Sequence, residues 1–185
     1  MRNKNELYLT PRMFCCEWHP FNSVEGLQQL IGDCLTPESV MVEIGSFAGV
    51  SSELFAQHCQ QVTCIDIWDS DPGHPGLGQE VLKQARDMFE IVRNGYSNIE
   101  MIQCYGRQAL HLIQEQSLDL IYIDASHHYE SVKEDIALWT PKVRNEGWIT
   151  GHDYYWEGVA KAVNEVSSEI RTYPDDSWAF KNIGR

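Results

Sequence analysis

The sequence predicts an α/β protein with a doubly wound, mostly parallel seven-stranded sheet, helices on both faces and an antiparallel last strand. Short β-rich runs alternate with longer segments of helical periodicity along most of the chain. The first β-rich run, 39–44, is almost continuously apolar, which suits a strand that is buried on both faces. Strand–helix alternation of this kind implies right-handed crossovers, and therefore parallel strands covered by helices above and below.

The predicted elements follow one another in a regular order. Asn22 and Glu25 resemble a capping box at the start of a first helix that we expect to end near Cys34. Turn-forming residues mark a loop over 69–76, and Pro174-Asp-Asp marks a turn between the last two strands. The predicted strands are 39–44, 61–66, 99–104, 118–124, 147–151, 171–173 and 178–183. Further helices are predicted over 51–58, 81–92, 108–114, 129–139 and 159–170.

Length and composition limit the functional classes. A chain of 185 residues suits a single domain, 1–185, with one substantial core. The apolar runs are too short to cross a bilayer and the N-terminus lacks a signal-peptide pattern, so we expect a cytoplasmic protein without membrane association. Because 14 basic residues stand against 27 acidic ones, the net charge of −13 argues against nucleic-acid binding and favours a small neutral or polar substrate.

The turn after the first predicted strand is a candidate ligand site. In open α/β sheets, ligands bind beyond the carboxyl ends of the strands, where the strand order reverses. Gly45 and Gly49 would allow a ligand to approach the backbone closely, at the positive end of the next helix. Asp66 ends the next strand, where a carboxylate can accept both ribose hydroxyls of a nucleoside. The glycines alone would also fit an ordinary strand-to-helix turn, but their order relative to Asp66 favours a nucleoside site.

The spacing of this turn resembles the first motif of class I S-adenosylmethionine-dependent methyltransferases, which have a Rossmann-like sheet. A dinucleotide-binding turn would need glycine where Phe47 stands, because the backbone there must approach a pyrophosphate. The resemblance implies that Glu43 holds the amino-acid part of S-adenosylmethionine, that Asp66 binds its ribose and that residues after the third strand line its adenine. The cofactor-binding set that it implies is Glu43, Gly45, Ser46, Phe47, Gly49, Asp66, Ile67, Tyr105, Gly106 and Asp124.

The second half of the chain carries a longer and more specific pattern. Asp124 to Asp135 reads D-x-x-H-x-Y-x-x-V-x-x-D, and Gly151-His-Asp-Tyr154 follows the fifth strand. These motifs resemble the subgroup that includes macrolide-sugar O-methyltransferases and cephalosporin-hydroxylase-like proteins, over about 25–155. The resemblance implies methyl transfer to a hydroxyl of a small polar or sugar-like acceptor.

Related O-methyltransferases hold a divalent metal with one carboxylate after strand four and an adjacent pair after strand five. By this resemblance Asp124, His152 and Asp153 are the metal ligands, with Mg²⁺ or Mn²⁺ as the ion. The pair here is His-Asp rather than Asp-Asp or Asp-Asn, and an imidazole shifts the preference from Mg²⁺ towards Mn²⁺, Zn²⁺ or Fe²⁺. Two alternatives stay open: His152 supports a ligand without binding the ion itself, or the protein binds no metal.

His127 is the predicted catalytic base, together with Asp124 as a second catalytic residue. It lies three residues after Asp124, where catechol-type relatives carry a lysine base, and imidazole can accept a proton near neutral pH. The alternative is an ordinary loop histidine, with His128 as an equal candidate for the base. Trp68 could cover the adenine or pack beneath the following loop.

Other classes of function and of assembly remain open. The chain could be a metal-independent methyltransferase acting on another acceptor, a nucleotide-binding oxidoreductase, or a non-catalytic cofactor-binding protein. The N-terminal segment 1–22, with Phe14, Trp18 and Phe21, could form a lid or close the sheet edge. Since no long extension builds an acceptor pocket, a homo-oligomer is a further expectation.

Overall fold

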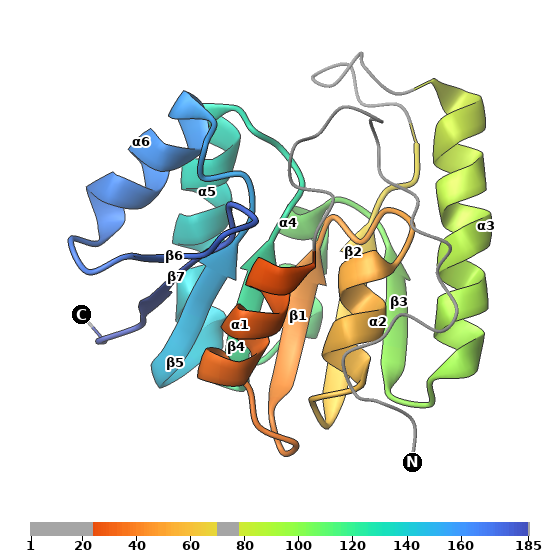
Figure 1. Cartoon of the computed structure of the whole chain (residues 1–185), viewed down its shortest axis with the longest axis horizontal. Helices are drawn as coiled ribbons and strands as arrows, with labels where there is room; N and C mark the ends of the chain where they lie inside the picture. Colours follow the sequence, from red (N-terminus) through yellow and green to blue (C-terminus); the bar gives the residue numbers. More distant parts are fainter. Residues whose placement is uncertain (1–23, 70–77, 185) are drawn as a thin grey trace.

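The computed structural model describes residues 24–69 and 78–184. Within these residues seven strands form one sheet in the order β3-β2-β1-β4-β5-β7-β6 (Figure 1). β7 runs antiparallel to both of its neighbours, and the other described pairings are parallel, which confirms the predicted sheet with its antiparallel last strand. The strands are β1 (Val40–Ile44), β2 (Gln61–Asp66), β3 (Ile99–Gln103), β4 (Leu118–Ile123), β5 (Val143–Gly151), β6 (Arg171–Thr172) and β7 (Trp178–Lys181).

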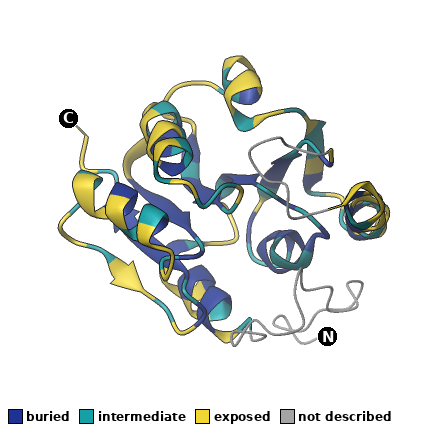
Figure 2. Ribbon diagram, turned by 90° about the horizontal axis from the view of Figure 1, so that it is seen from above, coloured by how far each residue is buried: buried dark blue, intermediate teal, exposed yellow. Residues whose placement is uncertain are grey.

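Helices cover both faces of the sheet. Figure 2 shows the helices with buried inner sides and exposed outer sides around the buried strands. One face is covered by α1 (Glu25–Cys34), α2 (Val50–Ala56) and α3 (Gln79–Gly95). The other is covered by α4 (Gly106–Ala109), α5 (Tyr129–Trp139) and α6 (Glu157–Val166). The chain changes from one face to the other between β3 and β4, and the strand order reverses between β1 and β4.

The two apolar cores follow from the alternation of side chains along each strand. Met41 packs with the residues of α1, α2 and α3, whereas its neighbour Val42 packs on the opposite face of the sheet. Phe55 meets the ring of Tyr122 edge-on at 5.0 Å in the first core, and Trp139 is fully buried in the second. The apolar first strand is therefore buried on both faces, as its sequence predicts.

Element ends differ from the predictions where polar residues continue an element. β5 begins at Val143, four residues before the predicted 147, because 144–146 are exposed and carry no apolar signal. α3 extends beyond 81–92 at both ends, and α6 ends at Val166 rather than at 170. A short 3-10 turn, Leu110–Leu112, replaces the end of the helix predicted over 108–114.

Some predictions fall outside the described residues. These are the capping role of Asn22, the lid formed by 1–22 with Phe14, Trp18 and Phe21, and most of the 69–76 loop. Across 24–69 and 78–184, none of the helices combines the length and the apolar character that crossing a membrane requires.

Candidate active site

The carboxyl ends of the central strands bring the predicted site residues to one edge of the sheet. Asp124 follows β4 and its backbone N–H donates to the carbonyl of Ile44, at the end of β1, at 2.8 Å. His152 follows β5 and donates to the carbonyl of Ile123 at 3.1 Å. The turn that begins at Gly45 therefore lies directly beside Asp124, where the strand order reverses.

The glycine turn between β1 and α2 is needed for packing as well as for access. Gly45 has φ +88°, and a Cβ atom there would lie 1.9 Å from the carbonyl oxygen of Asp124. Gly49 has φ +83° and directly precedes α2. Phe47, between them, also adopts a left-handed conformation with φ 43°, which is uncommon for a residue with a side chain. Local strain of this kind is held by the contacts of the surrounding residues.

Glu43 lies beneath this turn and is fully buried, with 0% of its surface exposed. Its carboxylate accepts a hydrogen bond from the Ser46 hydroxyl at 2.7 Å and from the hydroxyls of Ser51 and Ser52. Burial raises the pKa of Glu43, and these hydroxyl donors oppose the rise. The two serines of α2 were not predicted, because polar residues on a buried helix face do not follow the apolar pattern.

Asp66 joins the glycine turn to the loop after β2. Its carboxylate accepts from the backbone N–H of Phe47 at 2.9 Å and from that of Trp68 at 2.8 Å. Burial raises the pKa of Asp66, and these backbone donors oppose the rise. Backbone hydrogen bonds from Ile67 and Ser46 also stabilise the charged carboxylate, and Asp66 is only partly buried, so a ligand can still reach it.

Trp68 is buried against α3 and the glycine turn, and most of the loop under which it was expected to pack lies outside the described residues. It is 5% exposed, its ring lies 4.8 Å from that of Phe89, and its indole N–H donates to the carbonyl of Phe47 at 2.7 Å. The side chain therefore holds the backbone of the glycine turn from the side of α3.

A pocket of about 280 Å³ opens beside the ends of β2 and β3. Gly106, which we expected near the adenine, packs close to Ile44, since a Cβ atom there would lie 3.2 Å from that side chain. The pocket includes Ile67 and Tyr105, two predicted cofactor-binding residues, together with residues that were not predicted to bind the cofactor. Its lining residues are Ile67, Asp69, Gln103, Cys104, Tyr105 and Gln108.

Two acids and two histidines gather at the ends of β4 and β5. His127 Nε2 lies 2.6 Å from Asp153 Oδ2, and His152 Nδ1 lies 3.3 Å from Asp153 Oδ1. His152 Nδ1 is also 3.9 Å from Asp124 Oδ1. The structure thus brings together the three predicted metal ligands and the predicted base. Of the two adjacent histidines, His127 lies in this cluster, while His128 immediately precedes α5.

The electrostatics of this cluster are strongly perturbed. Burial raises the pKa of Asp124 to about 7, although the charge of His152 opposes the rise. Burial lowers the pKa of His152, but the carboxylates of Asp124 and Asp153 outweigh it and raise that pKa to about 10. Burial also favours protonation of Asp153, yet hydrogen bonds from His127 and His152 hold its pKa well below the usual range. Mutually shifted groups of this kind are typical of sites for proton or metal chemistry.

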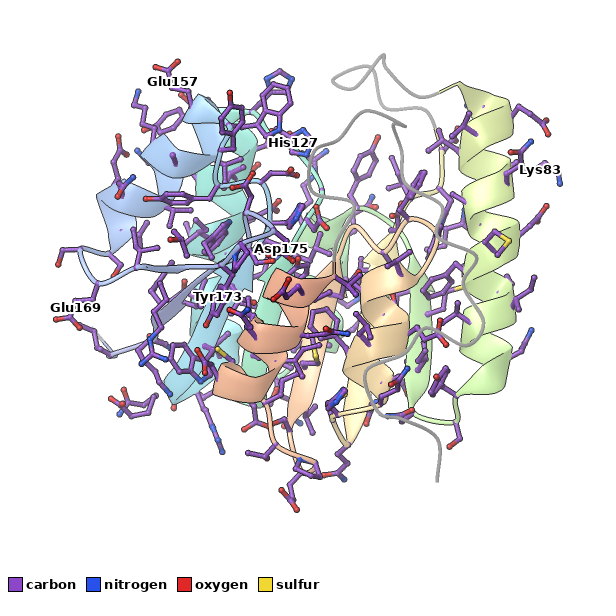
Figure 3. All side chains as sticks on the ribbon, viewed as in Figure 1. Lys83, His127, Glu157, Glu169, Tyr173 and Asp175 are labelled. Carbon is purple, nitrogen blue, oxygen red and sulfur yellow. The ribbon has the colours of Figure 1, made fainter. Side chains whose placement is uncertain are left out.

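The hydrogen bond to Asp153 raises the pKa of His127, against the effect of burial. Its imidazole is held on one face as well, because it stacks on the indole of Trp156 with centroids 5.5 Å apart and planes 5° apart. Figure 3 places His127 at the edge of the molecule beyond the strand ends. The sequence analysis missed Trp156, which lies in the segment after Tyr154.

Comparisons with known proteins agree with this geometry. A family model described as "Methyltransferase domain" matches residues 42–154. A protein of Acanthamoeba polyphaga mimivirus is 29% identical, in a match that covers 96% of this chain and 80% of that protein. The structure of the O-methyltransferase NovP is similar, with a TM-score of 0.60 and 17% identity over 85% of this chain and 78% of that one. A Streptococcus mutans structure in complex with S-adenosylhomocysteine has a TM-score of 0.60 and 11% identity, covering 84% and 94%.

At these identities the solved structures show the fold, and the family model carries the assignment. Its match covers more than half of the chain. It extends from the end of β1, through Asp66 and Asp124, to His152 and Asp153, and so includes both the glycine turn and the acid–histidine cluster. The chain belongs to this methyltransferase-domain family and is a class I S-adenosylmethionine-dependent methyltransferase.

Proposed function

We propose that the enzyme is an O-methyltransferase that methylates a hydroxyl of a small polar or sugar-like molecule, with His127 as the base. The observation that carries this proposal is the 2.6 Å contact between His127 and Asp153, placed at the same sheet edge as the glycine turn. Methylation of a hydroxyl requires removal of its proton as the new bond to carbon forms, and this pair is suited to accept that proton.

The residues around the glycine turn fit the cofactor. S-adenosylmethionine supplies a methyl group that is already activated by its sulfonium. We assign the ribose to Asp66, which is partly buried and contacts the glycine turn, and the adenine to the pocket that contains Ile67 and Tyr105. Because Glu43 has no exposed surface, we assign it an indirect part, in which its serine hydroxyls hold the turn that faces the amino-acid portion.

The proton of the acceptor hydroxyl would pass to His127. Its side chain is 37% exposed, so an acceptor can reach the ring. The contact of Nε2 with Asp153 fixes the orientation of the imidazole that receives this proton. The carboxylate of Asp153 then stabilises the imidazolium and keeps the ring in one orientation.

A divalent metal also fits this edge of the sheet. Asp124, His152 and Asp153 each offer one ligand atom, and these atoms lie within 4.8 Å of one another. A set of two carboxylates and one imidazole suits Mn²⁺ better than Mg²⁺, which prefers oxygen ligands. When bound, the ion would act as a Lewis acid that lowers the pKa of the acceptor hydroxyl.

A metal-independent reaction is the second candidate, and one observation favours it. Both carboxylate oxygens of Asp153 already contact an imidazole, Oδ2 that of His127 at 2.6 Å and Oδ1 that of His152 at 3.3 Å. In this arrangement Asp153 serves the base rather than an ion.

Four measurements test these proposals. Calorimetry with S-adenosylhomocysteine and with NAD comes first, and binding of NAD alone would point to the oxidoreductase alternative. A screen of hydroxyl and amine acceptors with labelled S-adenosylmethionine follows, and transfer to amines only would contradict O-methylation. Turnover in chelator, then with added Mn²⁺ or Mg²⁺, separates the metal-assisted reaction from the metal-independent one. Light scattering of the purified protein tests the proposed homo-oligomer.

A further inference from the structure

Two exposed aromatic residues follow Asp153 closely in the chain, and one of them, Trp156, stacks on His127 of the acid–histidine cluster. Tyr155 is 80% exposed and Trp156 is 51% exposed, on the connection between β5 and α6. Exposed aromatic surface costs free energy in water, so neighbouring exposed rings next to a reactive cluster indicate a surface that a ligand covers.

The connection that carries these rings is held in place by several contacts. The N–H of Trp156 donates to the carbonyl of Asp153 at 2.9 Å, and the indole N–H of Trp178 donates to the carbonyl of His152 at 2.9 Å. At the start of α6, a Cβ atom on Gly158 would lie 2.6 Å from the carbonyl oxygen of His127. The two aromatic residues are therefore attached to a fixed backbone, as a preorganised binding surface requires.

His127 covers only part of the Trp156 indole, and Trp156 is 51% exposed. Stacked rings lie about 3.5 Å apart along their normal, so a centroid distance of 5.5 Å between nearly parallel rings means a lateral offset of about 4 Å. The indole therefore extends beyond the imidazole. A flat ring that lies on this overhang is brought edge to edge with His127, where a hydroxyl on its rim can meet the base.

The charges around this surface select against anionic ligands. Asp153 and Glu157 flank the aromatic pair in the chain, and the whole protein carries a net charge of −13. Figure 3 shows Glu157 at the same edge of the molecule as His127. The positive charge of His152, whose pKa is raised to about 10, offsets that of Asp153, so the repulsion of an anionic acceptor comes from Glu157 and from the net charge of the whole protein.

We infer that Tyr155 and Trp156 form the acceptor-binding surface and take an uncharged, hydroxyl-bearing ring that stacks on the overhanging indole. This inference rests on the proposed function, because it is the role of His127 as base that makes the position beside its ring productive. The C–H face of a pyranose and the face of a phenol share the required chemistry.

Binding is measured first, independently of turnover. The probes are methyl β-glucopyranoside, phenol and the anionic methyl glucuronoside, each added to the protein saturated with S-adenosylhomocysteine and followed by saturation-transfer NMR. We expect at least one neutral probe to bind and the glucuronoside to bind at least tenfold more weakly than its neutral counterpart. The preferred neutral probe identifies the source of the ring. Failure of both neutral probes to bind, or equal binding of the glucuronoside, overturns the inference.

Variants locate the surface. Tyr155→Ala and Trp156→Ala should each lower the affinity for the neutral probe by about tenfold. Trp156→Phe, which keeps a stacking ring, should retain most of the wild-type affinity. Ile183→Ala is the matched control, because Ile183 is also an exposed apolar residue but follows β7 at the opposite edge of the sheet. The melting temperature and the affinity for S-adenosylhomocysteine report whether each variant folds. Unchanged probe binding in both alanine variants overturns the inference. Because the Tyr155 side chain is 80% exposed, Tyr155→Ala should not affect folding, so its effect on binding can be interpreted directly.

Turnover then separates this inference from the proposed function. Tyr155→Ala should raise KM about tenfold and leave kcat unchanged, whereas Trp156→Ala should also lower kcat because the indole supports His127. Methyl transfer with unchanged KM in both variants would leave the function standing and refute the aromatic surface. If a ring binds in a way that depends on Trp156 but no hydroxyl is methylated, the aromatic binding surface is supported and O-methylation is refuted.

Discussion

His127 Nε2 lies 2.6 Å from Asp153 Oδ2, and this contact joins the segment after β4 to the segment after β5. Asp153 reaches the imidazole from a left-handed conformation with φ 62°, which is uncommon outside glycine. A strained residue that holds a histidine is typical of a site where geometry has been retained for function.

Replacement of either His127 or Asp153 should lower turnover without lowering the affinity for the cofactor. We expect His127→Ala and Asp153→Asn to reduce kcat by roughly 10²- to 10⁴-fold, the usual contribution of a positioned base. Calorimetry with S-adenosylhomocysteine should give the wild-type affinity in both. His128→Ala is the matched control and should keep near wild-type turnover. Loss of activity in His128→Ala with normal activity in His127→Ala would reverse the assignment.

Gly45→Ala should destabilise the fold as well as the site. The added Cβ would lie 1.9 Å from the carbonyl oxygen of Asp124, at a residue with φ +88°. We expect a loss of about 2–4 kcal/mol in the free energy of unfolding, measured by urea denaturation. Gly32→Ala, inside α1 with no atom within 4 Å of its added Cβ, should instead stabilise the protein by about 0.5–1 kcal/mol. Equal effects of the two substitutions would contradict the close approach at Gly45.

Asp66→Ala should lower the affinity of the protein for its cofactor. The variant loses the acceptor that we assign to the ribose and also frees the backbone N–H groups of Phe47 and Trp68. We expect the Kd for S-adenosylhomocysteine to rise at least tenfold, equivalent to about 1.4 kcal/mol or more. Asp87→Asn, which changes a solvent-exposed pair with Lys83, should leave this Kd unchanged. Wild-type affinity in Asp66→Ala would remove this residue from the cofactor site.

Glu43 should make stability depend on pH. Its pKa is raised in the folded state by burial, so the folded protein binds a proton more tightly than the unfolded chain. Its contribution is therefore fully present below the ordinary glutamate pKa of 4.5 and is lost as pH rises through the folded-state pKa. Glu43→Gln does not titrate, so the difference in melting temperature between this variant and the wild type should shift in favour of the variant as pH rises. A difference that stays constant with pH would show that the carboxyl is not perturbed.

The sequence predicted the sheet because its strands are apolar and end in polar residues. Asp124 and His152 were predicted at one edge because parallel strands place their carboxyl ends together, whatever the details of packing. The start of β5 was not predicted, because residues 144–146 are exposed and polar and carry no strand-like apolar pattern. These outcomes depend on burial pattern alone.

Contacts within the site could not be predicted in the same way. The stacking of Trp156 on His127 depends on the left-handed turn at Asp153, and a sequence does not reveal that an aspartate will adopt it. The closed environment of Glu43 is set by hydroxyls from α2, whose spacing only matters once that helix packs on β1. Side-chain partners of this kind are fixed by tertiary structure.

Glu43 and its serine partners form a unit whose members are interdependent. Glu43→Ala would leave buried serine hydroxyls without their hydrogen-bond acceptor. Ser52→Ala would leave one oxygen of the buried Glu43 carboxylate with one donor fewer. Replacing the acid and its donors together by apolar residues of similar shape should therefore disturb the protein less than the sum of the separate changes. Glu43 thus holds the glycine turn in place from within the core. We expect a homologue that lacks this acid to have replaced the serines as well.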